Sequence, residues 1–424
     1  MTQDTLPVVT GDAVRDALRA RREIALIDVR DEHSFAQAHP LFAAQFTLAR
    51  LEADAPWRLP RRDVDIVVYD DGEGLAAPAA QRLQALGYSR VSLLDGGLSG
   101  WREGGGELFR DVNVPSKAFG ELVEQERHTP SLAAEDVKAL LDAKADVVVL
   151  DARRFDEYRT MSIPQGISVP GAELALRVRA LAPNPATRVI VNCAGRTRSI
   201  IGTQSLVNAG IPNPVAALRN GTIGWTLAGF ALEHGQTRRF GSVSDADHAH
   251  AREAARALAA RAGAQRLGAD ALDRPDPTDH TVYRYDVRTP EEYAAGHLPG
   301  FGSAPGGQLV QETDVFAPVR GARIVLADDD GVRAPMTAHW LAQMGWDVAW
   351  LDGVPSARFA ATDAWPPHAP APDAVAPAKR YRRPYEGTDN PREAMQAYLD
   401  WEFGLVAQLA RDGTHGFKVL GAGA

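Results

Sequence analysis

One short segment of the sequence combines residue types suited to nucleophilic chemistry, Cys193-Ala-Gly-Arg-Thr-Arg-Ser199. It follows the apolar run 189–192 and precedes a helix-like stretch that ends near Asn208. A cysteine placed between a strand and a helix faces unpaired backbone N–H groups and the positive end of the helix dipole, which stabilise an anion. We therefore expect Cys193 to be exposed, to have a depressed pKa and to act as a nucleophile.

The other residues of the loop are candidate ligands for an anion. Gly195 lets the backbone curve without a Cβ clash, and two arginines add positive charge. The predicted binding residues are Ala194, Gly195, Arg196, Thr197, Arg198 and Ser199. The alternatives are a small buried hydrophobe for the cysteine and solvated surface charge for the arginines. The sequence does not decide which arginine faces the substrate.

Two further segments repeat the pattern around this loop. Each of three strand-like runs ends in Asp-x-Arg. In every case, a second equivalent position, which is Cys193 in the middle copy, lies 42 residues after the aspartate. The three pairs are Asp28 and Asp70, Asp151 and Cys193, and Asp286 and Asp328. Each second position lies 17 residues before a glycine, namely Gly87, Gly210 or Gly345. We conclude that the chain contains three copies of one unit.

Each copy alternates short β-rich runs with helix-like stretches, which predicts an α/β fold with a small parallel sheet flanked by helices. In such sheets, ligands bind at the carboxyl ends of strands, where the Cys193 loop lies. We predict modules at 1–112, 129–240 and 246–358, and a tail at 379–424. Residues 362–378 are rich in proline and alanine and are predicted to form a linker.

The tail is predicted to contain one helix that Asn390 caps and Gly413 ends, with Pro391 in its first turn. Its apolar stripe comprises Met395, Leu399, Phe403, Val406 and Ala410. We expect this helix to dock on the body of the protein rather than to bind a partner.

Together, Asp-x-Arg followed by Glu and an aromatic residue, the cysteine loop and the later Gly-Thr-Ile-Gly-Trp225 resemble the rhodanese, or sulfurtransferase, family. The resemblance covers three tandem modules. It implies that Cys193 takes a sulfane sulfur as a persulfide and passes it to a thiophilic acceptor. The implied donor is of the thiosulfate, 3-mercaptopyruvate or persulfide type, and the implied acceptor is cyanide, a small thiol or a protein thiol.

Asp151, Arg153 and Trp225 are predicted to support the site structurally. Glu157 occupies a position where thiosulfate-type members carry an arginine, and its charge is expected to disfavour thiosulfate. Asp70 and Asp328 replace the cysteine in modules one and three. A carboxylate cannot form a persulfide, so we predict that these two modules are inactive.

Two other functions fit parts of this pattern. The first is a Cys-dependent phosphatase, but such enzymes use Cys-x5-Arg, and Arg198 comes one position too early. The second is a non-catalytic binding or regulatory protein, which two cysteine-free modules would suit.

Composition narrows the choice further. Lys and Arg number 46 against 55 Asp and Glu, a net charge of −9 with no basic tract, which disfavours nucleic-acid binding. No apolar run is long enough to span a membrane, and no secretory signal is visible. A single cysteine allows no intramolecular disulfide or internal thiol relay. We expect a cytoplasmic enzyme that needs no metal or cofactor.

Overall fold

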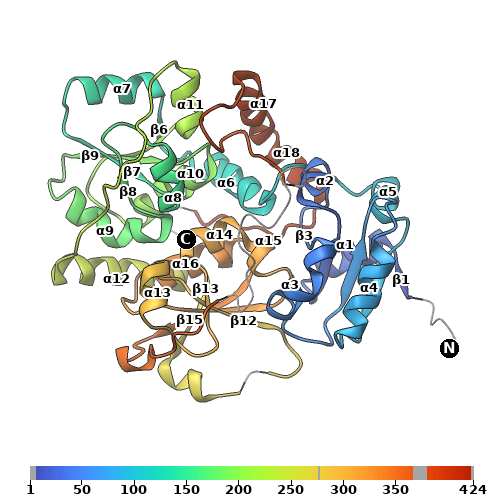
Figure 1. Cartoon of the computed structure of the whole chain (residues 1–424). Helices are drawn as coiled ribbons and strands as arrows, with labels where there is room; N and C mark the ends of the chain where they lie inside the picture. The colour runs from blue at the N-terminus through green and yellow to red at the C-terminus, as the bar shows by residue number, and fades with distance from the viewer. Residues whose placement is uncertain (1–5, 276, 366–379, 422–424) are drawn as a thin grey trace.

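The computed structural model describes residues 6–275, 277–365 and 380–421. Three α/β modules follow one another and are succeeded by two helices (Figure 1). Each module contains a five-stranded sheet in which every neighbouring pair of strands is parallel. The predicted fold class is therefore confirmed. Most of the predicted linker falls in residues 366–379, which lie outside the described part of the chain.

Module one has the sheet order β1-β5-β4-β2-β3. Its strands are β1 (Val8–Val9), β2 (Ala25–Asp28), β3 (Ala43–Gln45), β4 (Ile66–Tyr69) and β5 (Val91–Leu94). Its helices are α1 (Gly11–Arg19), α2 (Glu32–Gln37), α3 (Leu51–Arg58), α4 (Ala76–Ala85) and α5 (Gly97–Glu103). The helix α6 (Val114–Arg127) leads into the next module.

Module two repeats the arrangement as β6-β10-β9-β7-β8. Its strands are β6 (Ser131–Leu132), β7 (Val147–Asp151), β8 (Ile167–Ser168), β9 (Arg188–Asn192) and β10 (Val215–Leu218). Its helices are α7 (Ala134–Asp142), α8 (Phe155–Thr160), α9 (Leu174–Leu181), α10 (Thr197–Asn208) and α11 (Gly221–Leu227). The helix α12 (Asp245–Arg261) follows and packs on α9.

Module three has the order β11-β15-β14-β12-β13. Its strands are β11 (Gln265–Gly268), β12 (Val282–Asp286), β13 (Gly302–Ser303), β14 (Arg323–Ala327) and β15 (Asp347–Asp352). Its helices are α13 (Pro290–Ala295), α14 (Gly306–Gln311), α15 (Thr313–Phe316) and α16 (Arg333–Gln343). Short 3-10 helices cover Leu48–Arg50, Gly171–Glu173, Ala269–Asp273 and Ser356–Arg358.

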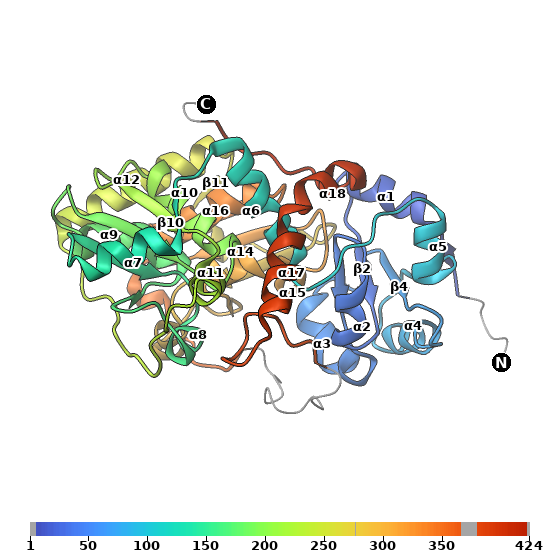
Figure 2. The same ribbon diagram turned by 90° about the horizontal axis from the view of Figure 1, so that it is seen from above.

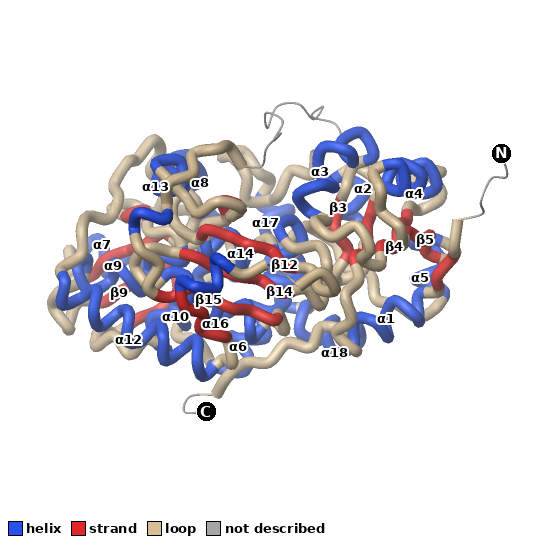
Figure 3. The backbone as a smooth tube through the Cα atoms, turned by 90° about the horizontal axis from the view of Figure 1, so that it is seen from below, coloured by secondary structure: helices blue, strands red, loops and turns tan. Residues whose placement is uncertain are grey.

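The central strands are buried on both faces, as expected for parallel sheets covered by helices. All four residues of β4 are buried, and so are the last four of β9. Figure 3 shows the strands in the interior of the modules, with helices around them. The three sheets share one strand order, so the carboxyl ends of β2, β7 and β12 lie at equivalent places in the three modules. The same holds for their neighbours β4, β9 and β14.

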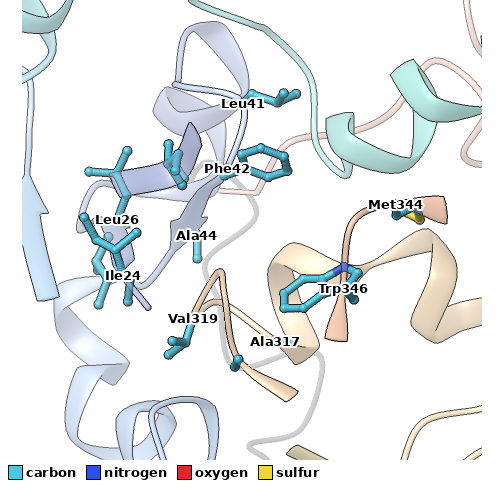
Figure 4. Packing of buried hydrophobic residues seen from close by; sticks show 14 of the residues in the cluster. Ile24, Leu26, Leu41, Phe42, Ala44, Ala317, Val319, Met344 and Trp346 are labelled. Atoms are coloured by element: carbon cyan, nitrogen blue, oxygen red, sulfur yellow. The ribbon is translucent and has the colours of Figure 1, made fainter. Parts of the chain in front are cut away.

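Modules one and three share one hydrophobic core. Ile24 and Arg320 exchange two backbone hydrogen bonds of 3.1 and 2.9 Å across their boundary. Figure 4 shows Leu26 and Phe42 of module one in the same packed region as Val319 and Trp346 of module three. The two cysteine-free modules are therefore packed together as one unit.

The tail forms two helices, α17 (Arg392–Phe403) and α18 (Leu405–Asp412), which lie between modules one and two (Figures 1 and 2). The helix α17 contacts α11 and α6, and α18 contacts α6. The tail is thus docked, as predicted. The prediction of one continuous helix capped by Asn390 was wrong, because the helix starts after Pro391 without a side-chain cap and is interrupted at Gly404.

This interruption changes which tail residues are buried. Met395 and Leu399 are buried as predicted, whereas Phe403 is 54% exposed. Beyond Gly404 the buried positions are Leu405 and Leu409. The helix α18 therefore packs on α6 through a different face from the one predicted, which contained Val406 and Ala410.

Candidate active site

Cys193 lies directly after β9, in the loop that leads into α10. The strand β9 is in the middle of its sheet, between β7 and β10. The helix begins at Thr197, within the loop segment that the sequence singled out. The cysteine therefore sits at the carboxyl edge of a parallel sheet and next to a helix N-terminus, as the sequence predicted.

The loop is curled so that its carbonyl groups point away from its centre. The carbonyl oxygens of Cys193 and Ala194 accept hydrogen bonds of 2.9 and 3.0 Å from the amides of Thr222 and Ile223. Gly221 makes this approach possible, because it has a φ of +55° and a Cβ there would lie 2.3 Å from the Cys193 oxygen. Among the described residues, the amides of residues 194–198 have no acceptor. We call this group of amides the amide cradle.

The equivalent loops of the other modules hold an acceptor that belongs to the chain itself, the carboxyl group of an aspartate. The carboxylate of Asp70 accepts hydrogen bonds from the amides of Gly72, Leu75 and Ala76. The carboxylate of Asp328 accepts from the amides of Gly331 and Ala334, at 3.0 and 2.7 Å. The same backbone geometry in module two is therefore suited to an anion on Cys193.

The sulfur of Cys193 differs from the sequence prediction in exposure and acidity. The residue is 2% exposed, and its thiol donates a 3.4 Å hydrogen bond to Ser199 Oγ. Burial raises the pKa of Cys193, and the nearby Glu402 adds to this, although Arg198 and Ser199 act in the opposite direction. The predicted exposed thiol with a depressed pKa was therefore wrong. The physical reason is that the tail covers the loop and removes water from the sulfur.

Arg196 holds the loop in place rather than facing its centre. Its guanidinium donates to both carboxylate oxygens of Glu121 on α6, at 2.7 and 2.8 Å, and also contacts Glu124. It lies 4.2 Å from the centre of the Phe403 ring in the tail. With its charge matched by carboxylates, Arg196 tethers the loop to α6.

Arg198 occupies the other side of the loop. It lines a cavity of about 640 Å³ between module two, module three and the segment 380–387, together with Arg153 and Tyr385. Its guanidinium donates to both oxygens of Glu157, at 2.7 and 2.8 Å. Of the two arginines, it is therefore Arg198 that borders open space and lowers the pKa of Cys193.

The pairing changes the interpretation of Glu157. Burial acts to raise its pKa, but the charge and hydrogen bonds of Arg198 outweigh burial and bring the pKa to about 2. Module three contains the same pair, Glu292 with Arg333, and the pKa of Glu292 is also about 2. The carboxylate of Glu157 is thus neutralised by its partner, which removes the basis for expecting it to repel a dianion.

Asp151 and Arg153 form a buried ion pair behind the loop. Arg153 donates to both oxygens of Asp151, at 2.9 and 2.7 Å, and to the carbonyl of Met161. Asn192 donates to Asp151 from the neighbouring strand. The pairs Asp28 with Arg30 and Asp286 with Arg288 repeat this arrangement. The pair therefore joins the ends of β7 and β9.

The remaining predicted residues pack around the loop. Trp225 is fully buried, and its Nε1 donates to the carbonyl of Ala231. Thr197 is buried against Gly120 of α6, where a Cβ on the glycine would lie 3.0 Å from Thr197 Cγ2. Gly195 faces the tail, since a Cβ at this position would lie 3.2 Å from both Glu402 Oε2 and Tyr398 Cε1.

Sequence reasoning missed the tail residues that approach the site, above all Tyr398 and Glu402. Their signal was a charged residue, one turn after a tyrosine, on the face of the helix that otherwise carries apolar residues. It also missed the pair of Glu157 and Arg198, although the same 41-residue separation recurs between Glu292 and Arg333.

The structure supplies two further observations on ligands and membranes. In the described ranges, no group of three or more His, Cys, Asp or Glu side chains is arranged to hold a metal ion. None of the described helices is long and apolar enough to cross a membrane.

Comparison with known proteins identifies the modules. The family model described as "Rhodanese-like domain" matches residues 11–104, 133–228 and 269–354. The chain belongs to the rhodanese-like domain family. The three matched segments contain Asp70, Cys193 and Asp328 at the three cradles.

Two relatives of this rhodanese-like chain are informative. A crystal structure described as thiosulfate sulfurtransferase from Pseudomonas aeruginosa is 57% identical, with a TM-score of 0.95, and covers 98% of this chain and 100% of that one. A thiosulfate sulfurtransferase of Azotobacter vinelandii is 27% identical over 216 residues, which are 46% of this chain and 79% of that protein. The first similarity extends over all three modules and the tail.

Proposed function

We propose that this chain is a sulfurtransferase that carries a sulfane sulfur as a persulfide on Cys193. The observation that supports this most directly is the amide cradle, whose counterparts hold carboxylates while that of module two holds a thiol. A persulfide anion has the charge that these amides stabilise. Modules one and three, with aspartate at this position, take no sulfur in this proposal.

The reaction has two displacement steps. The Cys193 thiolate attacks the outer sulfur of a donor such as thiosulfate, the sulfur–sulfur bond of the donor breaks, and sulfite leaves with the electron pair. Cyanide or a thiolate then attacks the outer sulfur of the persulfide, and the Cys193 thiolate is restored. The amides of residues 194–198 hold the anion in both states, and Arg198 adds positive charge.

Thiosulfate is the proposed donor. The names of both relatives support it, and Arg198 neutralises the carboxylate that had argued against it. A panel of thiosulfate, 3-mercaptopyruvate, polysulfides and glutathione persulfide tests the choice. A donor with a kcat/KM well above that of thiosulfate would contradict it.

The proposed acceptor is a small molecule, such as cyanide or a low-molecular-weight thiol. The sulfur lies beneath the tail, so a thiol on a folded protein has no direct approach to it. The cavity beside Arg198 has room for a small donor or acceptor. A lone cysteine that must stay reduced suits the cytoplasm, where we propose that the protein works.

Mass spectrometry tests the covalent step. After incubation with thiosulfate and removal of the excess, we expect the intact protein to gain the mass of one sulfur atom and to lose it again on addition of cyanide. The Cys193→Ser variant is the control and should gain nothing. A wild-type protein that gains no sulfur from any donor of the panel would instead favour a non-catalytic binding role.

A further inference from the structure

Glu402 is a buried carboxyl group directed at the active-site loop from the last turn of α17. It is 1% exposed. One oxygen, Oε1, accepts a 2.9 Å hydrogen bond from the hydroxyl of Tyr398. The other, Oε2, is buried without a hydrogen-bond partner among the described residues, and it is the atom that would lie 3.2 Å from a Cβ on Gly195. Burying an oxygen without a hydrogen-bond partner costs free energy of folding, so a native structure that does so calls for an explanation.

The charged groups around Glu402 are already matched with other partners. Lys117 of α6 forms a 2.6 Å ion pair with Asp111, and Arg196 of the loop is held by Glu121. Glu121 itself is close enough to repel a charge on Glu402. No cation of the described chain is left for Glu402 alone.

These surroundings favour the neutral carboxyl group. Burial and the charge of Glu121 raise the pKa of Glu402 to about 8, although Lys117, Tyr398 and Arg196 act in the opposite direction. At neutral pH the group therefore carries a proton. When Glu402 is ionised, its negative charge lies near the Cys193 sulfur and disfavours the thiolate.

We propose that Glu402 is a positioning residue of the active site, and that sulfur transfer requires it in its neutral form. This inference rests on the proposed sulfurtransferase function. The neutral group repels no anion in the amide cradle and keeps an O–H donor beside the loop. The ionised group opposes both the thiolate and the persulfide by like-charge repulsion.

The pH dependence follows from the two titrations. Because the pKa of Cys193 is raised and that of Glu402 is about 8, a rising pH ionises Glu402 before it ionises most of Cys193. The reactive form, with a thiolate on Cys193 and a neutral Glu402, is therefore a minor form whose share is greatest between the two pKa values. We therefore expect a bell-shaped profile in which the rate falls on the alkaline side as Glu402 loses its proton.

Single-turnover persulfide formation from thiosulfate, followed from about pH 6 to about pH 10, tests the proposal. Glu402→Gln stays neutral at every pH and should lose the alkaline decline, so that near pH 9.5 it reacts on the order of tenfold faster than the wild type. Glu393→Gln is the matched control, since Glu393 is an exposed glutamate on the same helix. It should retain the wild-type profile.

A second variant guards against a folding defect in the first. Tyr398→Phe removes the hydrogen bond that stabilises the charged carboxylate, so the alkaline decline should move to higher pH. The inference is overturned if wild type, Glu402→Gln and Tyr398→Phe form persulfide with the same pH profile. If the wild type forms no persulfide at any pH, the proposed function fails instead.

Discussion

Glu157 and Arg198 form the same ion pair beside Cys193 that Glu292 and Arg333 form beside Asp328. Both pairs join equivalent positions of the repeat. Only the first borders a thiol and the large cavity. The duplicate makes it possible to separate the contribution of this pair to the fold from its contribution to substrate binding.

Removing the carboxylate at Glu157 should strengthen donor binding. In Glu157→Gln, the charge of Arg198 is no longer neutralised, so the cavity becomes more attractive to a dianion. We expect the KM for thiosulfate to fall about three- to tenfold at low ionic strength, with the difference shrinking as salt is added. Steady-state kinetics at several salt concentrations measure this.

Glu292→Gln is the matched control, because it removes the same kind of charge far from the sulfur; its KM should equal that of the wild type.

Both variants, Glu157→Gln and Glu292→Gln, should lose stability. The folded-state pKa of each glutamate is about 2, below its unfolded value, so each pair stabilises the fold above about pH 4.5. That contribution disappears as the pH falls towards 2, so the denaturation curves of variant and wild type should converge in acid. Equal stability at neutral pH would contradict the role of the pairs in the fold.

The position of the active-site loop was predictable from the sequence, whereas the pKa of its cysteine was not. The position of Cys193 followed from local order, since a strand, a cysteine and a helix are consecutive in the sequence. The direction of its pKa depends on burial and on Glu402, which is more than two hundred residues away. No local pattern around the cysteine contains that information.

At the scale of elements, the docking of α17 determines access to the sulfur. Lys117 anchors this helix from α6. Its buried ammonium pairs with Asp111 and lies 5.1 to 5.6 Å from the ring centres of Tyr385, Tyr398 and Trp401. Such contacts contribute more when they are shielded from water.

Replacing the anchor should loosen the cover. Lys117→Met leaves Asp111 buried without its cation, so we expect α17 to detach more often. Cys193 should then react with a bulky disulfide reagent on the order of tenfold faster or more. The rate of thiol modification measures this. Lys138→Met, on the surface of α7, is the control; a rate unchanged in both variants would refute the anchoring role.

The helices of the tail show where periodicity succeeds and where it fails. Met395 and Leu399 were correctly identified as buried, because their spacing lies within one uninterrupted helix. The stripe failed beyond Gly404, where the break turns Leu405 and Leu409 inward. A period of 3.6 residues predicts one face only as long as the helix is continuous.

At the scale of the whole molecule, modules one and three should unfold together. The ring centre of Phe42 in module one lies 4.1 Å from the guanidinium carbon of Arg320, and the ring packs edge to face with that of Phe417 from the tail. Phe42→Ala should cost about 3–5 kcal/mol of unfolding free energy. We expect both modules to unfold in a single destabilised transition, which tryptophan fluorescence and circular dichroism should report at the same denaturant concentration. Two separated transitions would mean that the shared core does not couple the modules.

The three-module architecture was predictable because the repeat imposes equal spacing on equivalent positions. The contacts between modules were not, since Ile24 and Arg320 pair across nearly three hundred residues and no periodic pattern marks the pairing. The same holds for the tail between modules one and two. Sequence thus indicated what each unit is, and only the structure shows how the units support one another.

The aspartates in two of the cradles have a consequence for how rigid the working module is. The side chains of Asp70 and Asp328 accept the amide hydrogen bonds of their own loops, so those loops have their hydrogen-bond acceptors as soon as the chain folds. The amides of the Cys193 loop gain such an acceptor only when an anion is bound there. Loading with sulfur should therefore stabilise the central module without changing the other two.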